Sequence, residues 1–152
     1  IMDNPLTNGK EKNLDNLLES LKAEAVAVNK EFAEKLGIPQ SVAITCVKPS
    51  GTVSQLVDAA SGIHARHNPF YIRTVRGDKK DPLTKMMTDF GFPVEDDVMN
   101  PSQTAVFSFP MKVGSGAVFR TDMTAIQQLE LWLTYQKHWC EHKPSVTISV
   151  KE

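Results

Sequence analysis

Apolar residues recur every three or four positions over one long stretch of this sequence, from Asn13 to Leu36. The positions that share this spacing are Leu14, Leu17, Leu18, Leu21, Ala25, Val28, Phe32 and Leu36. The spacing predicts one amphipathic helix, whose apolar stripe must be buried against another element. Gly37 offers a left-handed residue that ends this helix, and Pro39 prevents its continuation.

Strand-like and helical segments alternate along the rest of the chain. The expected strands are Val42–Val47, Tyr71–Arg76, Thr104–Phe109 (ended by Pro110) and Val146–Val150. The expected helices are a short one opening within Lys48–Leu56, one from Pro82 to near Gly91, and one capped by Thr121–Asp122 that ends by Trp139. This alternation predicts the α/β class, with about four strands alternating with helices. Because the sequence stops just after an apolar strand, we expect a piece of a larger structure.

Composition places the chain among ordinary soluble domains. Of its 152 residues 41% are hydrophobic and 23% charged, which excludes disorder of the whole chain. The 17 basic and 18 acidic side chains give a net charge of −1, which favours neither nucleic acid nor a membrane as partner. No signal peptide or membrane-span pattern occurs, so we expect a cytoplasmic protein. Residues 1–12 are rich in Asn, Pro, Gly and Lys and are expected to be a linker or disordered lead-in.

The cysteines and histidines give weak functional signals. Cys46 and Cys140 lie far apart in apolar stretches, which favours two buried structural thiols over a disulfide. His138 and His142 fit the His-x-x-Glu-His pattern of a zinc helix, but Pro144 follows at once and only ten residues remain for a third ligand. We therefore expect no metal there. The pair His64 and His67 has no nearby carboxylate cluster, and we expect no metal there either.

Two nucleotide-binding motifs are absent. Gly114 and Gly116 match the start of a dinucleotide-binding fingerprint, but Phe119 stands where its third glycine belongs. No Gly-x-x-x-x-Gly-Lys sequence occurs, which excludes a Walker-type site.

The segment Lys48–Ser54 is the most informative part of the sequence. It joins a predicted strand to a predicted helix through a turn with Gly51 at its centre and hydroxyls on both sides. Unpaired N–H groups at a helix start favour an anion, and a glycine lets a phosphate approach the backbone. The alternative is a capped turn without a ligand. Lys143–Ser149 repeats five of these seven residues but has Val146 in place of the glycine, so only the first copy is predicted to admit an anion.

Several segments together resemble one enzyme family. They are Lys48–Ser54, Ser61–His64, Asp81–Leu83, Val106–Pro110, Gln127–Leu129 and Trp139–Ile148. In order and spacing they resemble the C-terminal catalytic region of adenosylcobalamin-dependent (class II) ribonucleotide reductases, and most of all the ribonucleoside-triphosphate reductases. The resemblance covers the chain from about Leu18 to Glu152.

The resemblance implies a fold, a chemistry and a site. The family fold is a ten-stranded α/β barrel, of which residues 13–152 would be the C-terminal portion. Adenosylcobalamin generates a thiyl radical that acts on a ribonucleoside triphosphate, and a thioredoxin-type partner restores the reducing cysteines. The family's Pro-Ser-Gly-Thr turn holds the substrate phosphates, a role that falls here on Ser50, Gly51, Thr52, Val53 and Ser54.

The sequence also departs from the family pattern. The chemistry needs three thiols, whereas this chain has two, and neither maps to the radical or redox cysteines. We therefore expect no catalytic residue here and an isolated chain that is inactive and self-associates through open strand edges, for instance as a homodimer. The alternatives are a free-standing phosphate- or nucleotide-binding module, and a scaffold protein without catalysis.

Overall fold

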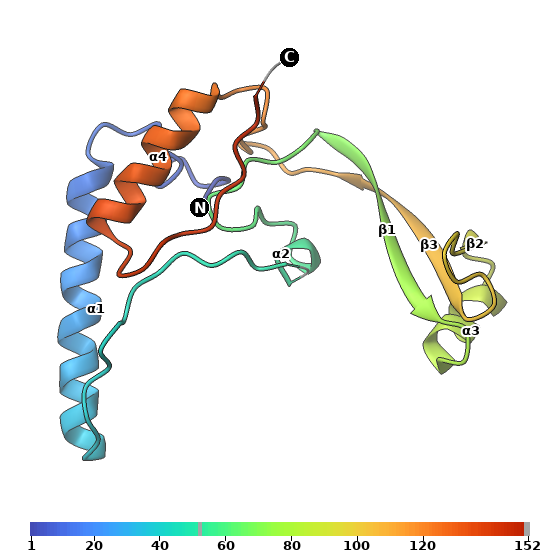
Figure 1. Ribbon diagram of the computed structural model, residues 1–152, viewed down its shortest axis with the longest axis horizontal. Helices are drawn as coiled ribbons and strands as arrows, with labels where there is room; N and C mark the ends of the chain where they lie inside the picture. Colours follow the sequence, from blue (N-terminus) through green and yellow to red (C-terminus); the bar gives the residue numbers. More distant parts are fainter. Residues whose placement is uncertain (52, 151–152) are drawn as a thin grey trace. The chain divides into compact units, whose positions relative to one another are not determined.

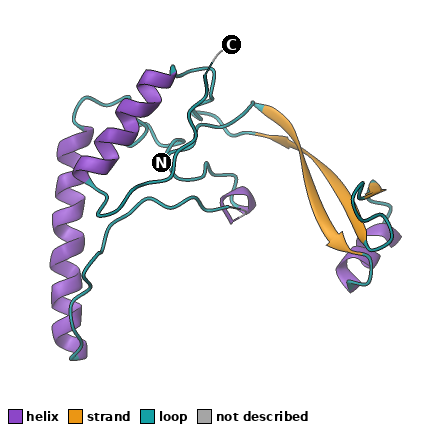
Figure 2. Cartoon of the chain, in the orientation of Figure 1, coloured by secondary structure: helices purple, strands orange, loops and turns teal. Residues whose placement is uncertain are grey.

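The computed structural model describes residues 1–51 and 53–150. These residues form two compact units, one made of Ile1–Asn68 together with the chain from Gly114 onward, the other of Pro69–Val113. The elements in chain order are α1 (Leu14–Leu36), α2 (Val53–Leu56), β1 (Phe70–Asp78), α3 (Pro82–Asp89), β2 (Val94–Asp96), β3 (Thr104–Lys112) and α4 (Ala125–His138), drawn in Figures 1 and 2. We call the first unit the helical unit and the second the sheet unit.

The helical unit is built on the packing of α1 against α4 (Figure 1). The first turns of α1 bury Leu14 and Leu18, and α4 buries Leu131 and Tyr135 in the same core. Helix α1 has the bounds that the apolar spacing predicts and ends on Gly37 at φ 66°, in the left-handed conformation that glycine adopts without strain.

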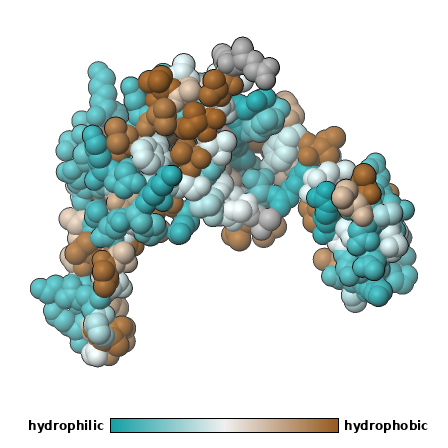
Figure 3. Space-filling model, viewed as in Figure 1, coloured by the Kyte–Doolittle hydropathy of each residue, from teal (hydrophilic) through white to brown (hydrophobic). Residues whose placement is uncertain are grey.

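The later half of α1 leaves its apolar stripe at the surface of the described chain. Phe32 is 54% exposed and Leu36 is 67% exposed. Ile38, just beyond the helix, is 56% exposed, and Figure 3 shows apolar side chains at the surface. Because Leu21 is also 47% exposed, the burial that the sequence pattern predicts is met only over the first turns of this helix, at Leu14 and Leu18.

The N-terminal segment, which we expected to be a linker or disordered lead-in, packs against the core of the helical unit. Met2 is fully buried in the core cluster. The Tyr135 hydroxyl donates a hydrogen bond of 2.7 Å to the Thr7 carbonyl, and burial raises the pKa of Tyr135 to about 12, so the hydroxyl remains a donor. The buried Met side chain outweighs the turn-forming composition of this segment.

The sheet unit is a three-stranded antiparallel sheet in the order β1-β3-β2. Strands β1 and β3 pair over their whole length, from Phe70 opposite Lys112 to Asp78 opposite Thr104. Helix α3 begins at Pro82, and the Asp81 side chain caps it by accepting from the Leu83 N–H. Both the strand expected at Tyr71–Arg76 and the helix expected from Pro82 are confirmed, whereas β2 has no counterpart among the predicted elements.

The prediction that Pro110 ends its strand is wrong, because β3 continues to Lys112. Strand β2 pairs with β3 only between Asp96–Ala105 and Val94–Phe107. Beyond Phe107, β3 is therefore flanked on one side only within the described chain. A proline is tolerated at such an edge, since its missing N–H removes no hydrogen bond on the open side.

Two predicted strands are absent from the described residues, which hold three strands where we expected about four. Val42–Val47 is unpaired, and its Thr45 N–H donates instead to the Glu141 carboxylate at 2.9 Å. Val146–Val150 is also unpaired, and its Ser149 N–H donates to the Gln128 side-chain oxygen at 3.0 Å. A strand needs a neighbouring strand, and the described part of this chain provides none for either segment.

Helix α4 begins three residues later than the Thr121–Asp122 cap that we predicted. Its N-cap is Thr124, which forms a capping box with Gln127. Asp122 instead closes a turn, because its carboxylate accepts from the Phe119 N–H at 2.9 Å. The predicted end of this helix, Trp139 at the latest, agrees with a C-cap at Trp139.

Candidate functional site

The segment that the sequence singled out forms a turn at the start of a short helix. Gly51 has φ 57°, the left-handed conformation, and α2 begins two residues later at Val53. A Cβ at Gly51 would meet no atom within 4 Å, so the glycine is needed for its backbone conformation rather than for space. Thr52 lies outside the described residues.

The other residues of this turn differ in burial and in bonding. Ser50 and Gly51 are exposed, and so is Val53, whose N–H donates to the Ser50 carbonyl at 3.2 Å. Ser54 is 5% exposed, and its hydroxyl has no hydrogen-bond partner within the described chain. Because a buried hydroxyl without a partner is costly, this atom is an unsatisfied polar group within the turn.

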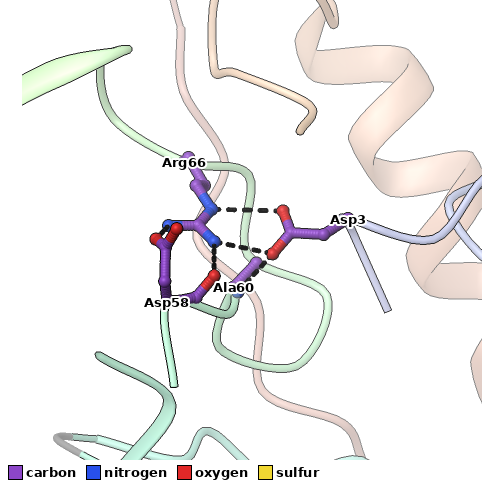
Figure 4. Close-up of polar contacts among 4 residues, drawn as sticks. All are labelled: Asp3, Asp58, Ala60 and Arg66. Atoms are coloured by element: carbon purple, nitrogen blue, oxygen red, sulfur yellow. Dashed lines mark hydrogen bonds and ion pairs between the residues drawn. The ribbon is translucent and has the colours of Figure 1, made fainter. Parts of the chain in front are cut away.

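Contacts from the following loop hold this turn, and our sequence analysis assigned them no role. The Ser61 hydroxyl accepts a hydrogen bond of 2.9 Å from the Ser50 N–H. Arg66, whose side chain is 7% exposed, lies between the carboxylates of Asp3 and Asp58 (Figure 4). A basic residue in a polar loop has no periodicity that marks it as buried, so only its place in the structure identifies it.

The charges around Arg66 stabilise one another. Burial raises the pKa of the Asp3 carboxyl, but hydrogen bonds from Arg66 and from the Ala60 N–H lower that pKa by more, so it lies below its ordinary value. The hydrogen bond to Asp3 raises the pKa of Arg66 against the opposing effect of burial. Asp3 and Arg66 therefore form a charged pair at neutral pH.

A mostly apolar cavity of about 350 Å³ lies beside the turn. Its lining includes Cys46, Val47, Lys48 and Gly62. Lys48 precedes the turn by two residues, and Gly62 follows Ser61, whose hydroxyl accepts from the Ser50 N–H. Gly62 is tightly placed, because a Cβ there would lie 3.2 Å from the Lys48 carbonyl oxygen. Lys48 is exposed and brings a positive charge to the rim. An amphiphilic anion fits these surroundings.

A second cavity of about 520 Å³ lies between the start of α1 and α4. Its lining has four carboxylates and two lysines, namely Glu11, Asp15, Asp122, Glu130, Lys10 and Lys12. This excess of negative charge disfavours an anion, so the smaller cavity beside the turn is the better candidate site.

The two cysteines are free, and their surroundings differ. Cys140 is 5% exposed, and burial raises the pKa of its thiol, as expected for a structural cysteine. Cys46 is only half-buried and faces the smaller cavity, so the expectation of two buried thiols holds for Cys140 alone.

The two histidines do not share a helix face. Helix α4 ends at His138, whose ring lies 2.7 Å from the Glu19 carboxylate on α1, whereas His142 follows the helix end. Residues 1–51 and 53–150 contain no group of three metal-ligating side chains. None of the helices described there is long and apolar enough to cross a bilayer.

Comparison with known proteins gives one consistent family. The chain is 34% identical over 119 residues to an adenosylcobalamin-dependent ribonucleoside-triphosphate reductase of Euglena gracilis, covering 78% of this chain and 16% of that protein. It is 27% identical over 146 residues to the enzyme of the same name from Lactobacillus leichmannii, covering 93% and 20%. A crystal structure of a B12-dependent (class II) ribonucleotide reductase superposes with a TM-score of 0.74 at 26% identity, over 91% of this chain.

The chain is homologous to the class II ribonucleotide reductases. This confirms the resemblance seen in the sequence, although no family model matches the chain. The chain spans a fifth or less of the length of these class II reductases, between 16% and 20%. The fold agreement extends over both units, since the superposed structure covers 91% of the chain.

Proposed function

We propose that this chain is part of an adenosylcobalamin-dependent ribonucleoside-triphosphate reductase and contributes the turn that binds the substrate phosphates. The observation that supports this most is the Ser50–Ser54 turn, in which a left-handed Gly51 precedes a buried Ser54 hydroxyl without a partner. A phosphate oxygen would accept from that hydroxyl and from N–H groups of the turn. The proposed binding residues are Ser50, Gly51, Thr52, Val53 and Ser54.

The surroundings of the turn favour a nucleotide over a bare anion. The Lys48 ammonium adds positive charge at the rim of the neighbouring cavity, and the apolar walls of that cavity suit a sugar or base. The cavity volume of about 350 Å³ is that of a small-molecule site. A ribonucleoside triphosphate is accordingly the proposed ligand.

We infer that the larger fold is the ten-stranded α/β barrel of this family, with residues 13–152 as its C-terminal portion. The two strand-like segments, Val42–Val47 and Val146–Val150, support this inference. Both are rich in β-branched residues, yet no strand within the described chain pairs with them. In the barrel their partners would be strands from the rest of the reductase chain.

The cysteines present do not fit the radical chemistry that adenosylcobalamin serves in these enzymes. Cys140 is buried with a raised pKa, and Cys46 lies in an unpaired segment beside an apolar cavity. We therefore assign no step through the cofactor to this chain, and propose that the cofactor acts with other parts of the reductase, as does a thioredoxin-type reductant. Supplied with cofactor, reductant and ribonucleotide, the isolated chain should form no deoxynucleotide, and measurable turnover would contradict this.

Two other functions remain as alternatives, a free-standing nucleotide-binding module and a scaffold protein. The exposed apolar residues Phe32, Leu36 and Ile38 favour a chain that packs against further protein. For the isolated chain we propose self-association, such as a homodimer, and a cytoplasmic location without nucleic acid or membrane partners. Light scattering at micromolar concentration tests the first point, and a stable monomer would contradict it.

The test of the phosphate-binding turn is a calorimetric titration of the chain with ATP and with inorganic triphosphate. We expect saturable binding that Gly51→Val weakens at least tenfold, because valine strongly disfavours the left-handed conformation. Gly37→Val is the matched control, since Gly37 has a similar φ of 66° and equally open space at the end of α1. Equal affinity of the Gly51→Val and Gly37→Val variants would refute the proposed site.

A further inference from the structure

The Ser50–Ser54 turn is fixed at its two ends by residues that lie outside it. At its start, the Ser50 N–H donates to the Ser61 hydroxyl at 2.9 Å. At the end of the turn, the Ser54 carbonyl accepts a hydrogen bond of 2.8 Å from the Ala59 N–H, which closes the backbone after α2. This closure places Asp58 at φ 48°, a left-handed conformation that is uncommon outside glycine, although aspartate adopts it more readily than most residues.

Arg66 provides the contacts that hold Asp58. Its Nη1 donates to the Asp58 carboxylate at 2.9 Å, and its Nη2 donates to the Asp58 carbonyl oxygen (Figure 4). The same guanidinium donates to both oxygens of Asp3, at 3.1 and 2.8 Å. Asp3 in turn accepts from the Ala60 N–H at 2.7 Å, so the residues that follow α2 are bound from two sides.

The position of Arg66 is itself determined by the backbone. Its N–H donates to the Val118 carbonyl and its own carbonyl accepts from the Arg120 N–H, both at 2.8 Å. This short bridge joins the loop to the segment before α4. The backbone of Arg66 is thus held in place, and its guanidinium binds Asp58 after the end of the turn. A planar guanidinium donates several hydrogen bonds in a fixed geometry, which a lysine ammonium does not.

The net charge of Asp3, Asp58 and Arg66 indicates that these side chains fix the shape of the turn rather than attract the anion. Two carboxylates face one guanidinium, and the side chain of Asp58, four residues after Ser54, is 44% exposed. A carboxylate near an anion weakens its binding through charge alone. Its presence is explained if Asp58 keeps the turn in shape.

We propose that Ser61, Asp58 and Arg66 are positioning residues that pre-organise the Ser50–Ser54 turn for a triphosphate, with Asp3 orienting Arg66. This inference rests on the proposed function of the turn. It means that the affinity for the anion depends on contacts that do not touch the anion.

The experiment measures the affinity of the chain for inorganic triphosphate and for ATP at constant ionic strength. Asp58→Ala should weaken binding about tenfold, even though it removes a negative charge, because the turn loses its fixed end. Asp58→Asn should bind within about twofold of the unchanged chain, since an amide oxygen still accepts from Arg66 and asparagine tolerates a left-handed φ. Ser61→Ala, which removes one anchor, should weaken binding about fivefold.

Glu24→Ala is the control for the loss of a negative charge, because Glu24 is exposed and belongs to the same unit, and it should leave the affinity unchanged within about twofold. Circular dichroism of each variant verifies that it is folded. If Asp58→Ala binds as tightly as the unchanged chain, or more tightly, electrostatics governs the site and the positioning role is wrong. If the unchanged chain binds neither probe, the proposed function fails and the inference fails with it. If Gly51→Val abolishes binding while Asp58→Ala and Ser61→Ala bind normally, the inference alone is overturned.

Discussion

Replacing Arg66 by glutamine should destabilise the helical unit by about 3 kcal/mol at neutral pH. The guanidinium donates to Asp3 at 2.8 and 3.1 Å and to Asp58 at 2.9 Å, and its own side chain is 7% exposed. A hydrogen bond to a charged group contributes about 1.5–3 kcal/mol. Asp58 is 44% exposed and regains water when Arg66 is lost, so most of the expected cost comes from Asp3, at 28% exposure.

The assay is urea unfolding followed by tryptophan fluorescence. Both tryptophans of the chain, Trp132 and Trp139, lie in the helical unit, so the signal reports this unit alone. The control is Arg120→Gln, which changes the same charge at an exposed position and should alter stability by no more than about 0.5 kcal/mol. A loss below about 1 kcal/mol for Arg66→Gln would refute the claim that this cluster stabilises the unit.

The ion pair between Arg66 and Asp3 also predicts how the difference in stability between the unchanged chain and Arg66→Gln depends on pH. The folded-state pKa of Asp3 lies below its ordinary value of 3.8. Its contribution to stability is therefore present above pH 3.8 and is lost as the pH falls through the lower folded-state pKa. The gap in stability between the unchanged chain and Arg66→Gln should accordingly narrow in acid, and a gap that stays constant would contradict the assigned ion pair.

Three further predictions concern other parts of the chain. Gly77→Ala should destabilise the sheet unit by about 1–3 kcal/mol, because its Cβ would clash with the Thr84 hydroxyl, and faster amide exchange in β3 would verify this. Glu141→Ala should lower the protection of the Thr45 amide against exchange, because the Thr45 N–H donates to the Glu141 carboxylate at 2.9 Å. Hydrogen bonds from the Ile44 and Thr45 N–H groups hold the pKa of Glu141 below its usual value, so the protection factor, corrected for the intrinsic exchange rate at each pH, should also fall once acid protonates this carboxylate, and unchanged protection would contradict the contact. The purified chain should hold no zinc, and stoichiometric zinc lost on His142→Ala would show this to be wrong.

Local sequence signals predicted the elements whose causes are local. The apolar spacing of α1 and the glycine at position 37 define a helix with the bounds that the structure shows. Pro82 likewise marks the start of α3, which ends at Asp89, two residues before the predicted end near Gly91. The turn at Gly51 is likewise encoded locally, because a left-handed residue between a hydroxyl-rich segment and a helix start has few alternatives.

Elements that depend on distant partners could not be predicted in the same way. Val42–Val47 has the composition of a buried strand. In the described chain, however, its Thr45 N–H donates to the Glu141 carboxylate, and no neighbouring strand pairs with it. The cap of α4 was predicted at Thr121–Asp122, whereas the reciprocal hydrogen bonds between Thr124 and Gln127 place it at Thr124. Arg66 carries no periodic signal at all, since its burial arises from carboxylates 63 and 8 residues away.

The central claim, that the Ser50–Ser54 turn binds the phosphates of a nucleotide, is tested most directly by an NMR titration of the isotope-labelled chain with ATP. The backbone amides of Gly51 and Ser54 should shift progressively and saturate, while the amide of Glu130, beside the acidic cavity, should not move. Inorganic triphosphate should shift the same amides of the turn. Shifts confined to the surroundings of Glu130, or no saturable shift at Gly51 and Ser54, would contradict the account.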